Sequence, residues 1–96
     1  MISKTGLEDL LKGKSSDVSD EARAWYRAAR AASWQSLQDV RKAFPDADMV
    51  GAVLIFNIRG NRYRLIVTEV FARQRLYVKA LLTHKEYDRK EWTKWA

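Results

Sequence analysis

The amino-acid sequence predicts an α+β fold, in which N-terminal helices pack on an antiparallel sheet. Apolar residues recur at helical spacing in the first half of the chain, and from Val53 onward they alternate with a period of two. The alternating segments are rich in β-branched and aromatic residues and are joined by short turns. Because 96 residues suffice for one hydrophobic core, we predict a single domain over residues 1–96.

The first predicted helix lies in "TGLEDLLKGK", residues 5–14. Thr5 and Glu8 have the spacing of a capping box, and Gly13 marks the end of the segment. Three leucines between them fall on one face of a helix. We therefore expect a short helix that buries its leucines.

The second predicted helix lies in "SDEARAWYRAARAASW". Ser19 is the expected N-cap, and two acids follow it in the first turn, where the helix dipole favours them. Trp25 falls on the apolar stripe, and Trp34 follows the helix, so both are interpreted as core residues. The opposite face carries Arg23, Arg27 and Arg30. We interpret this row as a solvated face, with contact to RNA or to an acidic partner as the alternative.

A third helix is predicted to begin after Ser33 or Ser36, either of which can cap it, and to end before Pro45. Its apolar stripe comprises Leu37, Val40 and Phe44. The C-terminal tail, "HKEYDRKEWTKW", is polar with spaced aromatic residues. It is predicted to form a short helix or an irregular arm. Trp92 and Trp95 are interpreted as packing this tail down, with stacking on a base as the alternative.

A hairpin is predicted in "VLIFNIRGNRYRLIV", because Gly60 and Asn61 both adopt positive φ at little cost. This turn predicts a register that places Asn57 opposite Arg64. One face of the hairpin is then apolar apart from the Tyr63 hydroxyl, and we expect it to pack on the helices. The other face carries Asn57, Arg59, Arg62 and Arg64.

A further strand is predicted in "RLYVKALLT". Strict alternation assigns to the core face Leu76, Val78, Ala80 and Leu82. The basic face then receives Arg75, Tyr77, Lys79 and Leu81. Glu69, in the preceding strand, falls on the core side, so we expect that strand to bulge or to leave the sheet before it.

The three arginines around the predicted turn suggest a bound anion. Like charges opposite one another on a sheet destabilise it by up to ~1 kcal/mol. The alternative is that Arg59 and Arg62 extend into water, where screening weakens their repulsion. Arg64 lies further into the sheet, beside Asn57 and within reach of Lys79. It is therefore the stronger candidate for a phosphate ligand.

The net charge of +6 and the pI of about 9.8 favour a polyanionic partner, such as nucleic acid, an acidic protein or an anionic membrane. The chain has no cysteine, which excludes a disulfide framework and a cysteine nucleophile. Its first residues lack the apolar core of a signal peptide, and no apolar run approaches the ~18 residues of a membrane span. We therefore expect a cytoplasmic protein with no membrane partner.

The chemistry available to the chain is limited. His84 is the only histidine, and no metal-ligand or phosphate-loop motif is present, so we expect neither a metal nor a cofactor. RNA cleavage without a metal needs a base, an acid and cations around the phosphate. His84 and Tyr87 can transfer protons, and Arg64 and Lys79 can hold the charge. The alternative is that His84 is a surface or capping residue and that "KEYDRKEW" is a solvated helix face.

The segments "VLIFNIRGNRYRLIVTEV" and "LYVKALLTHKEYDRKEW" resemble the HigB-type toxins of type II toxin–antitoxin systems, within the RelE-like superfamily. The upstream "SLQDVRKAFPDAD" is similar to the helix and Phe-Pro segment of that family. The resemblance covers residues 36–92 and rests on FNI-x-GN-x-YRL and TH-x-EYD, in order. Residues 1–35 agree only in their helical character.

This resemblance implies two to three helices on a strongly bent antiparallel sheet of three to four strands, with a short C-terminal helix or arm. It also implies a toxin that acts as a metal-independent endoribonuclease on messenger RNA, commonly on the translating ribosome. The implied partner is a HigA-like antitoxin, a helix-turn-helix protein, and operator DNA would be bound only through the toxin–antitoxin complex.

The resemblance further implies four catalytic residues, Arg64, Lys79, His84 and Tyr87. Arg64 and Lys79 would bind the scissile phosphate, and His84 would act as base or acid. Tyr87 would be the second proton-transfer group or would stack on a base. Lys79 stands where the family often has arginine, and a lysine lacks the bidentate fork that grips a phosphate. The implied RNA-binding residues are Asn57, Arg59, Asn61, Arg62, Arg73 and Arg75.

Arg59 stands where the family often has a small residue, so it is interpreted as extra RNA affinity. Arg73 and Arg75 have the alternative reading of ordinary turn charges. Two other functions also fit the sequence: a nucleic-acid-binding protein without chemistry, and a ParE-like toxin that inhibits DNA gyrase. Pairing of His84 and Tyr87 with an arginine on the sheet favours the ribonuclease, because a protein that only binds needs charges and aromatic rings alone.

Overall fold

The computed structural model describes residues 4–60, 62–70 and 75–96. Three helices come first: α1 (Lys4–Leu11), α2 (Ser16–Ala31) and α3 (Leu37–Ala43). A four-stranded antiparallel sheet follows, in the order β1 (Asp48–Val50), β2 (Val53–Ile58), β3 (Tyr63–Val70) and β4 (Arg75–Thr83). The chain closes with helix α4 (His84–Asp88) and the 3-10 helix η2 (Glu91–Trp95).

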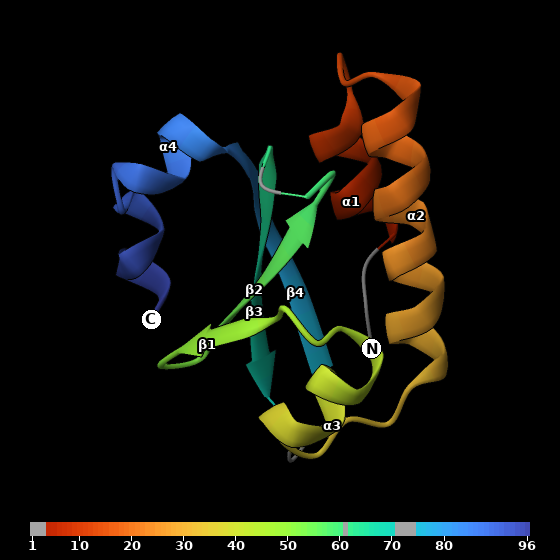
Figure 1. The fold of residues 1–96 in the computed structure, drawn as a ribbon, viewed down its shortest axis with the longest axis vertical. Coiled ribbons are helices and arrows are strands. Elements are labelled where there is room, and N and C mark those ends of the chain that lie inside the picture. Colours follow the sequence, from red (N-terminus) through yellow and green to blue (C-terminus); the bar gives the residue numbers. More distant parts are fainter. Residues whose placement is uncertain (1–3, 61, 71–74) are drawn as a thin grey trace.

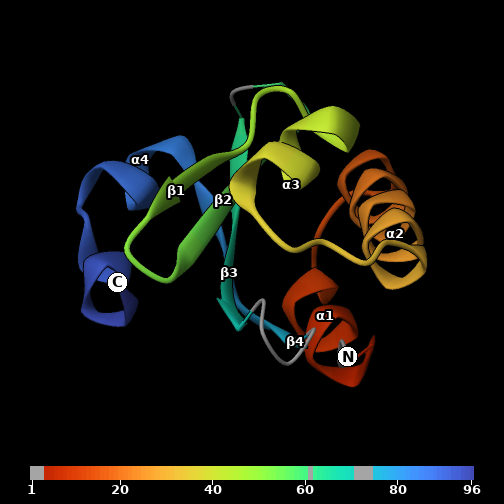
Figure 2. The same ribbon diagram turned by 90° about the horizontal axis from the view of Figure 1, so that it is seen from below.

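The elements form three layers, with the sheet in the middle. Helices α1, α2 and α3 cover one face of the sheet, and the C-terminal segment of α4 and η2 lies on the other (Figures 1 and 2). The predicted α+β class is therefore confirmed, and so is the short C-terminal helix. None of the helices in the described part of the chain is long and apolar enough to cross a membrane.

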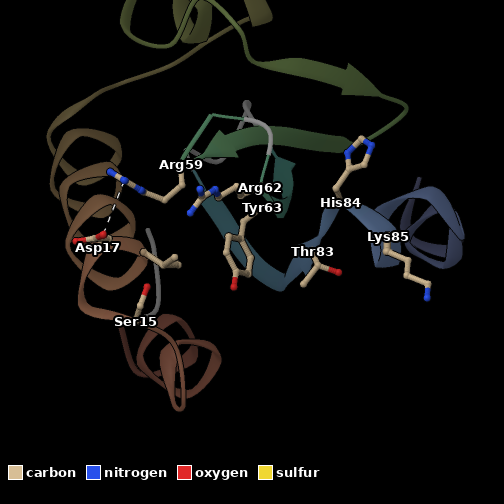
Figure 3. Close-up of a pocket in the computed structure, with 9 residues that line it drawn as sticks. Ser15, Asp17, Arg59, Arg62, Tyr63, Thr83, His84 and Lys85 are labelled. Atoms are coloured by element: carbon tan, nitrogen blue, oxygen red, sulfur yellow. Dashed lines mark ion pairs between the residues drawn. The ribbon is translucent and has the colours of Figure 1, made fainter.

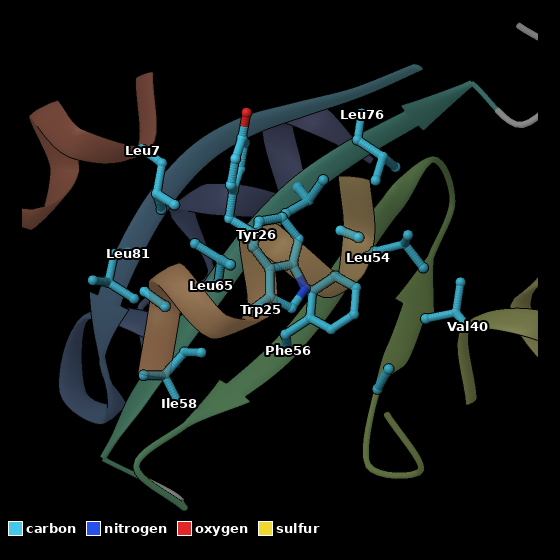
Figure 4. Close-up of a cluster of buried hydrophobic side chains, with 14 of the residues drawn as sticks. Leu7, Trp25, Tyr26, Val40, Leu54, Phe56, Ile58, Leu65, Leu76 and Leu81 are labelled. Carbon is cyan, nitrogen blue, oxygen red and sulfur yellow. The ribbon is translucent and has the colours of Figure 1, made fainter. Parts of the chain in front are cut away.

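The main core lies between the helices and the sheet (Figure 4). Trp25 of α2 packs against Phe56 of β2, with 5.1 Å between ring centroids, and Trp34 stacks on the same ring at 6.1 Å. Leu7 of α1 and Leu65 of β3 are completely buried in this core. These contacts confirm the predicted core roles of both tryptophans. Large aromatic rings bury the most apolar area per residue, so they contribute strongly to the core.

Two predicted helix starts are wrong. Helix α2 begins at Ser16 with Ser15 as its N-cap, so Ser19 lies inside the helix and is buried. The extra turn brings Val18 into the core, which supplies burial energy that a start at Ser19 would lose. Helix α1 begins at Lys4, so Thr5 lies inside it and is not its N-cap. The Glu8 carboxylate, which was expected in a capping box with Thr5, accepts hydrogen bonds from Arg23 at 2.8 and 3.0 Å.

Helix α3 follows one of its two predicted caps. The hydroxyl of Ser36 accepts a hydrogen bond from the Asp39 N–H at 3.4 Å, so Ser36 and not Ser33 is the N-cap. Strand β1, which pairs with Val53–Ile55 of β2, was not predicted as a separate element. Its three residues are too few to show an alternating pattern, and none of them is fully buried.

The register of the β2–β3 hairpin is the predicted one. Val53–Ile58 pairs with residues 63–68, and Asn57 lies opposite Arg64. Phe56 and Leu65 form a pair on the buried helix side. A shift of one residue would turn Phe56 and Leu65 away from the helices and bring Asn57 and Arg64 into the main core, which disfavours any other register.

The turn of this hairpin differs from the prediction. Positive φ angles occur at Gly60 (64°), as predicted, and at Arg59 (55°), which was not predicted. Asn61 lies outside the described residues. The N–H of Arg62 donates to the carbonyl of Arg59 at 3.2 Å. An arginine thus occupies a left-handed conformation that is costly for any residue with a Cβ.

Strand β4 contains a bulge that interrupts its alternation. Ala80 pairs with Ile66, and Val78 pairs with the next residue of β3, so Lys79 is left as an extra residue. The register does shift before Glu69, but the prediction that β3 itself would bulge or leave the sheet there is wrong. The extra residue belongs to β4, whereas β3 continues through the sheet.

The bulge reverses which side chains of β4 face the helices. Leu76 and Val78 pack on the main core, as predicted. Leu81 also lies in the main core, whereas Ala80 and Leu82 pack on the opposite side of the sheet. The predictions for these three residues are wrong, because strict alternation was counted across an extra residue.

Candidate active site

Three aromatic and cationic side chains contact one another on the sheet face away from the helices. The Arg64 guanidinium carbon lies over the Tyr87 ring, 5.3 Å from its centroid. The Tyr87 and Trp92 rings are stacked, with centroids 5.2 Å apart and planes inclined by 5°. We call Arg64, Tyr87 and Trp92 the Arg64 stack. It confirms the prediction that Trp92 packs the tail down.

The Arg64 stack is built from two directions. Arg64 comes from β3 and is half-buried, and its guanidinium donates to the Tyr63 carbonyl at 3.4 Å. Trp92 comes from η2 and is buried in a second apolar cluster with Val53, Ile55 and Ile66. The face predicted to be broadly basic therefore has an apolar centre, which Trp92 covers. The arginines Arg59 and Arg62 lie beyond this centre, near the turn.

Helix α4 carries Tyr87 and begins with a complete capping box. The Thr83 hydroxyl accepts from the Glu86 N–H at 3.2 Å, and the Glu86 carboxylate accepts from the Thr83 N–H at 2.9 Å. The hydrogen bond from the Thr83 backbone to the Glu86 carboxylate, and after it one from the Thr83 side chain to the same carboxylate, lower the pKa of Glu86. The cap matters because a helix of five residues has little stability of its own.

A second cationic region lies at the turn that joins β2 to β3. This region is a pocket of about 380 Å³, which we call the turn pocket. The residues that line it are Ser15, Asp17, Val18, Arg59, Arg62, Tyr63, Thr83, His84 and Lys85. Figure 3 shows Arg59 and Arg62 on one side and His84 on the other. The pocket thus joins α2, the hairpin turn and the start of α4.

Arg59 is held against α2 by two acids. Its backbone N–H donates to the Glu21 carboxylate at 2.7 Å, and its guanidinium lies 3.8 Å from the Asp17 carboxylate. These contacts hold Arg59 in its left-handed conformation and dock the turn on the helix. Its charge is therefore partly neutralised within the protein.

His84 is the first residue of α4 and lies at the rim of the turn pocket. The backbone N–H of His84 donates to the backbone carbonyl of Arg62 at 3.1 Å, and this bond ties α4 to the hairpin. The His84 Nε2 is 3.5 Å from the Asp88 carboxylate, and 60% of the His84 side chain is exposed. The imidazole is thus accessible from solvent and has an acid that orients it.

Lys79 projects from the bulge of β4. Its ammonium lies 5.8 Å from the ring centroid of Tyr77, and both side chains are exposed. Arg64 contacts Tyr87, whereas Lys79 and His84 have other partners. Of the four residues predicted to be catalytic, the structure therefore brings two into direct contact.

The sequence comparisons decide the family. A model of the HigB toxin family, described as the RelE-like toxic component of a toxin–antitoxin system, matches residues 18–90. The chain belongs to the HigB toxin family. The match begins well before residue 36, so it includes most of α2, which the motifs had left outside the resemblance.

Named relatives support this membership. The chain is 32% identical over 54 residues to the mRNA interferase toxin HigB of Escherichia coli K12, which covers 53% of this chain and 52% of that protein. It is 26% identical over 92 residues to the mRNA interferase HigB of Escherichia coli O6:H1, covering 93% of this chain and 88% of that protein. The chain thus spans about half the length of the first of these relatives.

The HigB motifs fall on both regions of the site. FNI-x-GN-x-YRL supplies Asn57, which is half-buried opposite Arg64, and the turn. TH-x-EYD supplies the cap of α4 together with His84 and Tyr87. Asn61 and Arg73 lie outside the described residues, and of Arg75 only the backbone, which opens β4, is described.

Sequence reasoning missed two features of this HigB chain. The first is the pair of acids, Asp17 and Glu21, that hold Arg59. Their spacing of one helical turn was a signal that they share one face of α2. Trp92 was interpreted as packing the tail or stacking on a base, and its contact with Tyr87 had no sequence signal. In the described residues, no group of three or more His, Asp or Glu side chains is placed to hold a metal.

Proposed function

We propose that this HigB-family chain is a toxin that cleaves messenger RNA without a metal ion. The observation that carries the proposal is the Arg64 stack: a half-buried guanidinium is held beside a tyrosine on a chain with a net charge of +6. No ion pair to a carboxylate involves Arg64 among the residues that the structure describes. Its remaining N–H donors are therefore available to a phosphate.

The proposed reaction is an internal displacement at phosphorus. The 2′-hydroxyl of one nucleotide attacks the neighbouring phosphorus, forming the O2′–P bond and breaking the P–O5′ bond. The products are a 2′,3′-cyclic phosphate and a 5′-hydroxyl. One group takes the proton from the 2′-hydroxyl, and another gives a proton to the leaving 5′-oxygen.

Arg64 binds the non-bridging phosphate oxygens and stabilises the charge that develops on them. Tyr87 and His84 are the proton-transfer groups. Tyr87 is adjacent to Arg64, and His84 approaches from the turn pocket with Asp88 as its orienting acid. Lys79 and Arg62 contact the phosphates that flank the cleaved one.

The proposed biological setting follows from the family. The relatives are named mRNA interferases, which supports messenger RNA as the substrate. A toxic component of a toxin–antitoxin system needs an antitoxin, and we propose a HigA-like helix-turn-helix protein, through which operator DNA is bound. Cleavage on the translating ribosome and a cytoplasmic location complete the proposal.

The test is cleavage of a defined messenger RNA by the purified chain, with the free RNA in EDTA and the ribosome-bound RNA in Mg²⁺, because ribosomes dissociate without Mg²⁺. Expected products carry a 5′-hydroxyl and a cyclic phosphate, and Arg64→Ala abolishes them. Arg27→Ala is the matched control, because Arg27 is an exposed arginine of α2. Intact RNA under both conditions with the wild-type chain, or cleavage of the free RNA that needs a divalent metal, would contradict the proposal.

A further inference from the structure

Trp92 lies behind Tyr87 and fixes it in two ways. The two rings are nearly parallel, with 5.2 Å between their centroids. The indole Nε1–H of Trp92 also donates to the backbone carbonyl of Tyr87 at 3.1 Å. One contact sets the plane of the phenol ring, and the other sets the main chain from which it projects.

Trp92 is itself anchored on the rigid part of the molecule. It is 5% exposed and packs with Val53, Ile55 and Ile66, which belong to the two central strands. The start of α4 is tied to the hairpin by the His84 backbone N–H, which donates to the Arg62 carbonyl at 3.1 Å. The indole of Trp92 ties the other end of α4, where Tyr87 lies, to the two central strands.

From this geometry we propose that Trp92 is a positioning residue for RNA cleavage, holding Tyr87 against the Arg64 guanidinium. The inference rests on the proposed function and deepens it. Contacts with Trp92 and Arg64 also occupy ring surface of Tyr87 that a base would need for stacking. The hydroxyl of Tyr87, and not its ring, is thus the part offered to the RNA.

The main test is the Trp92→Leu variant, which keeps an apolar side chain but loses the flat ring and the N–H donor. A displacement of about 1 Å at a reacting group can cost about 10²-fold in rate. We therefore expect kcat to fall by about 10- to 100-fold, while KM for the RNA changes little. Trp92→Phe restores a flat ring without the donor, and we expect it to recover part of the lost kcat.

The matched control is Trp34→Leu. Trp34 is buried to a similar degree, 7% exposed, but it packs on Phe56 on the helix side of the sheet. Both leucine variants lose core packing, so thermal unfolding is measured for each. The proposal is overturned if the two variants lose kcat in the same proportion, because Trp92 would then act only through stability. It is also overturned if Trp92→Leu stays folded and retains wild-type kcat.

A double-mutant cycle separates this inference from the proposed function. If Trp92 acts through Tyr87, then Trp92→Leu adds almost no further loss to a Tyr87→Phe variant. Fully additive losses would overturn the inference while leaving the ribonuclease intact. A wild-type chain that leaves RNA uncleaved would instead overturn the proposed function.

One measurement of the positioning does not depend on cleavage. The NMR signal of the Arg64 Nε–H reports the guanidinium's surroundings, and we expect it to shift in Trp92→Leu but not in Trp34→Leu. An unchanged Arg64 signal in a folded Trp92→Leu variant would overturn the inference even if no activity were detected. Should Trp92→Leu not fold, the same comparison is made with Trp92→Phe and Trp34→Phe.

Discussion

The Arg64 stack and the turn pocket contain arginines only a few residues apart, yet the structure uses them differently. Arg59, in the turn pocket, is held by Asp17 and by the Glu21 carboxylate in a left-handed backbone conformation. Arg64 lies over an aromatic ring, without a paired acid among the described residues. The difference shows that the charge of an arginine says little about its role until its partners are known.

Each partner has a distinct physical effect. A carboxylate neutralises a guanidinium and competes with phosphate for its N–H donors. An aromatic face attracts the guanidinium and orients it, but leaves its in-plane donors free. The same residue type therefore docks a turn at position 59 and leaves donors free at position 64, where we propose that a phosphate binds.

Arg64→Ala should have the largest effect on activity. Removing one preorganised donor to a developing oxyanion typically costs about 10²- to 10³-fold in kcat, and Arg64 is the expected phosphate ligand. Single-turnover cleavage of a short RNA measures the loss, with Arg59→Ala as the comparison. Equal losses in the two variants would remove the distinction between the two regions.

His84→Ala tests whether the turn pocket contributes to the chemistry. Loss of a general acid or base costs about 10²-fold or more, whereas Lys85→Ala, an exposed neighbour in the same pocket, should change kcat much less. The pH–rate profile is measured for both variants. If His84→Ala keeps the wild-type rate and profile, the chemistry belongs to the Arg64 stack alone.

Thr83→Ala should affect both regions to a smaller degree, because α4 carries His84 and Tyr87. Loss of an N-cap costs about 0.5–2 kcal/mol in the free energy of unfolding. Chemical denaturation of the variant and the wild type measures the difference. Wild-type stability in Thr83→Ala would show that the capping box does not hold α4.

The same capping box predicts a pH dependence. Hydrogen bonds from Thr83 lower the pKa of Glu86, so the ionised Glu86 carboxylate stabilises the fold. This stabilisation is complete above the ordinary pKa of a glutamate. The effect is lost as the pH falls through the lowered pKa. Glu86→Gln should therefore reduce the loss of stability in acid, as followed by denaturation at several pH values. An identical acid profile in the two proteins would contradict the assignment.

Arg59→Gly should have the smallest effect. Glycine removes the cost of a left-handed arginine and keeps the N–H that donates to Glu21, but it loses an exposed ion pair and adds backbone freedom to the unfolded chain. The net change in the free energy of unfolding should be less than about 1 kcal/mol, with cleavage close to wild type. A large loss of cleavage would return Arg59 to the RNA-binding residues.

The sequence by itself determined the fold class and the central hairpin. The change of period at Val53, the Gly60 turn and the apolar parity led to the correct register, because a shifted register would place Asn57 and Arg64 against the helices. The HigB motifs also selected Arg64 and Tyr87, which the structure brings into contact. The catalytic roles of these residues, of Lys79 and of His84 stay predictions.

Only the tertiary structure decided what surrounds those residues. The bulge at Lys79 reversed the side chains of β4 that follow it, and the sequence had pointed to an irregularity in β3 instead. Trp92 met Tyr87 because the C-terminal segment folds back over the sheet, and Arg59 met Asp17 because α2 passes beside the turn. Such contacts join residues that lie apart in the chain or on separate elements. Alternation and motif spacing describe only neighbours along the chain, so they could not contain this information.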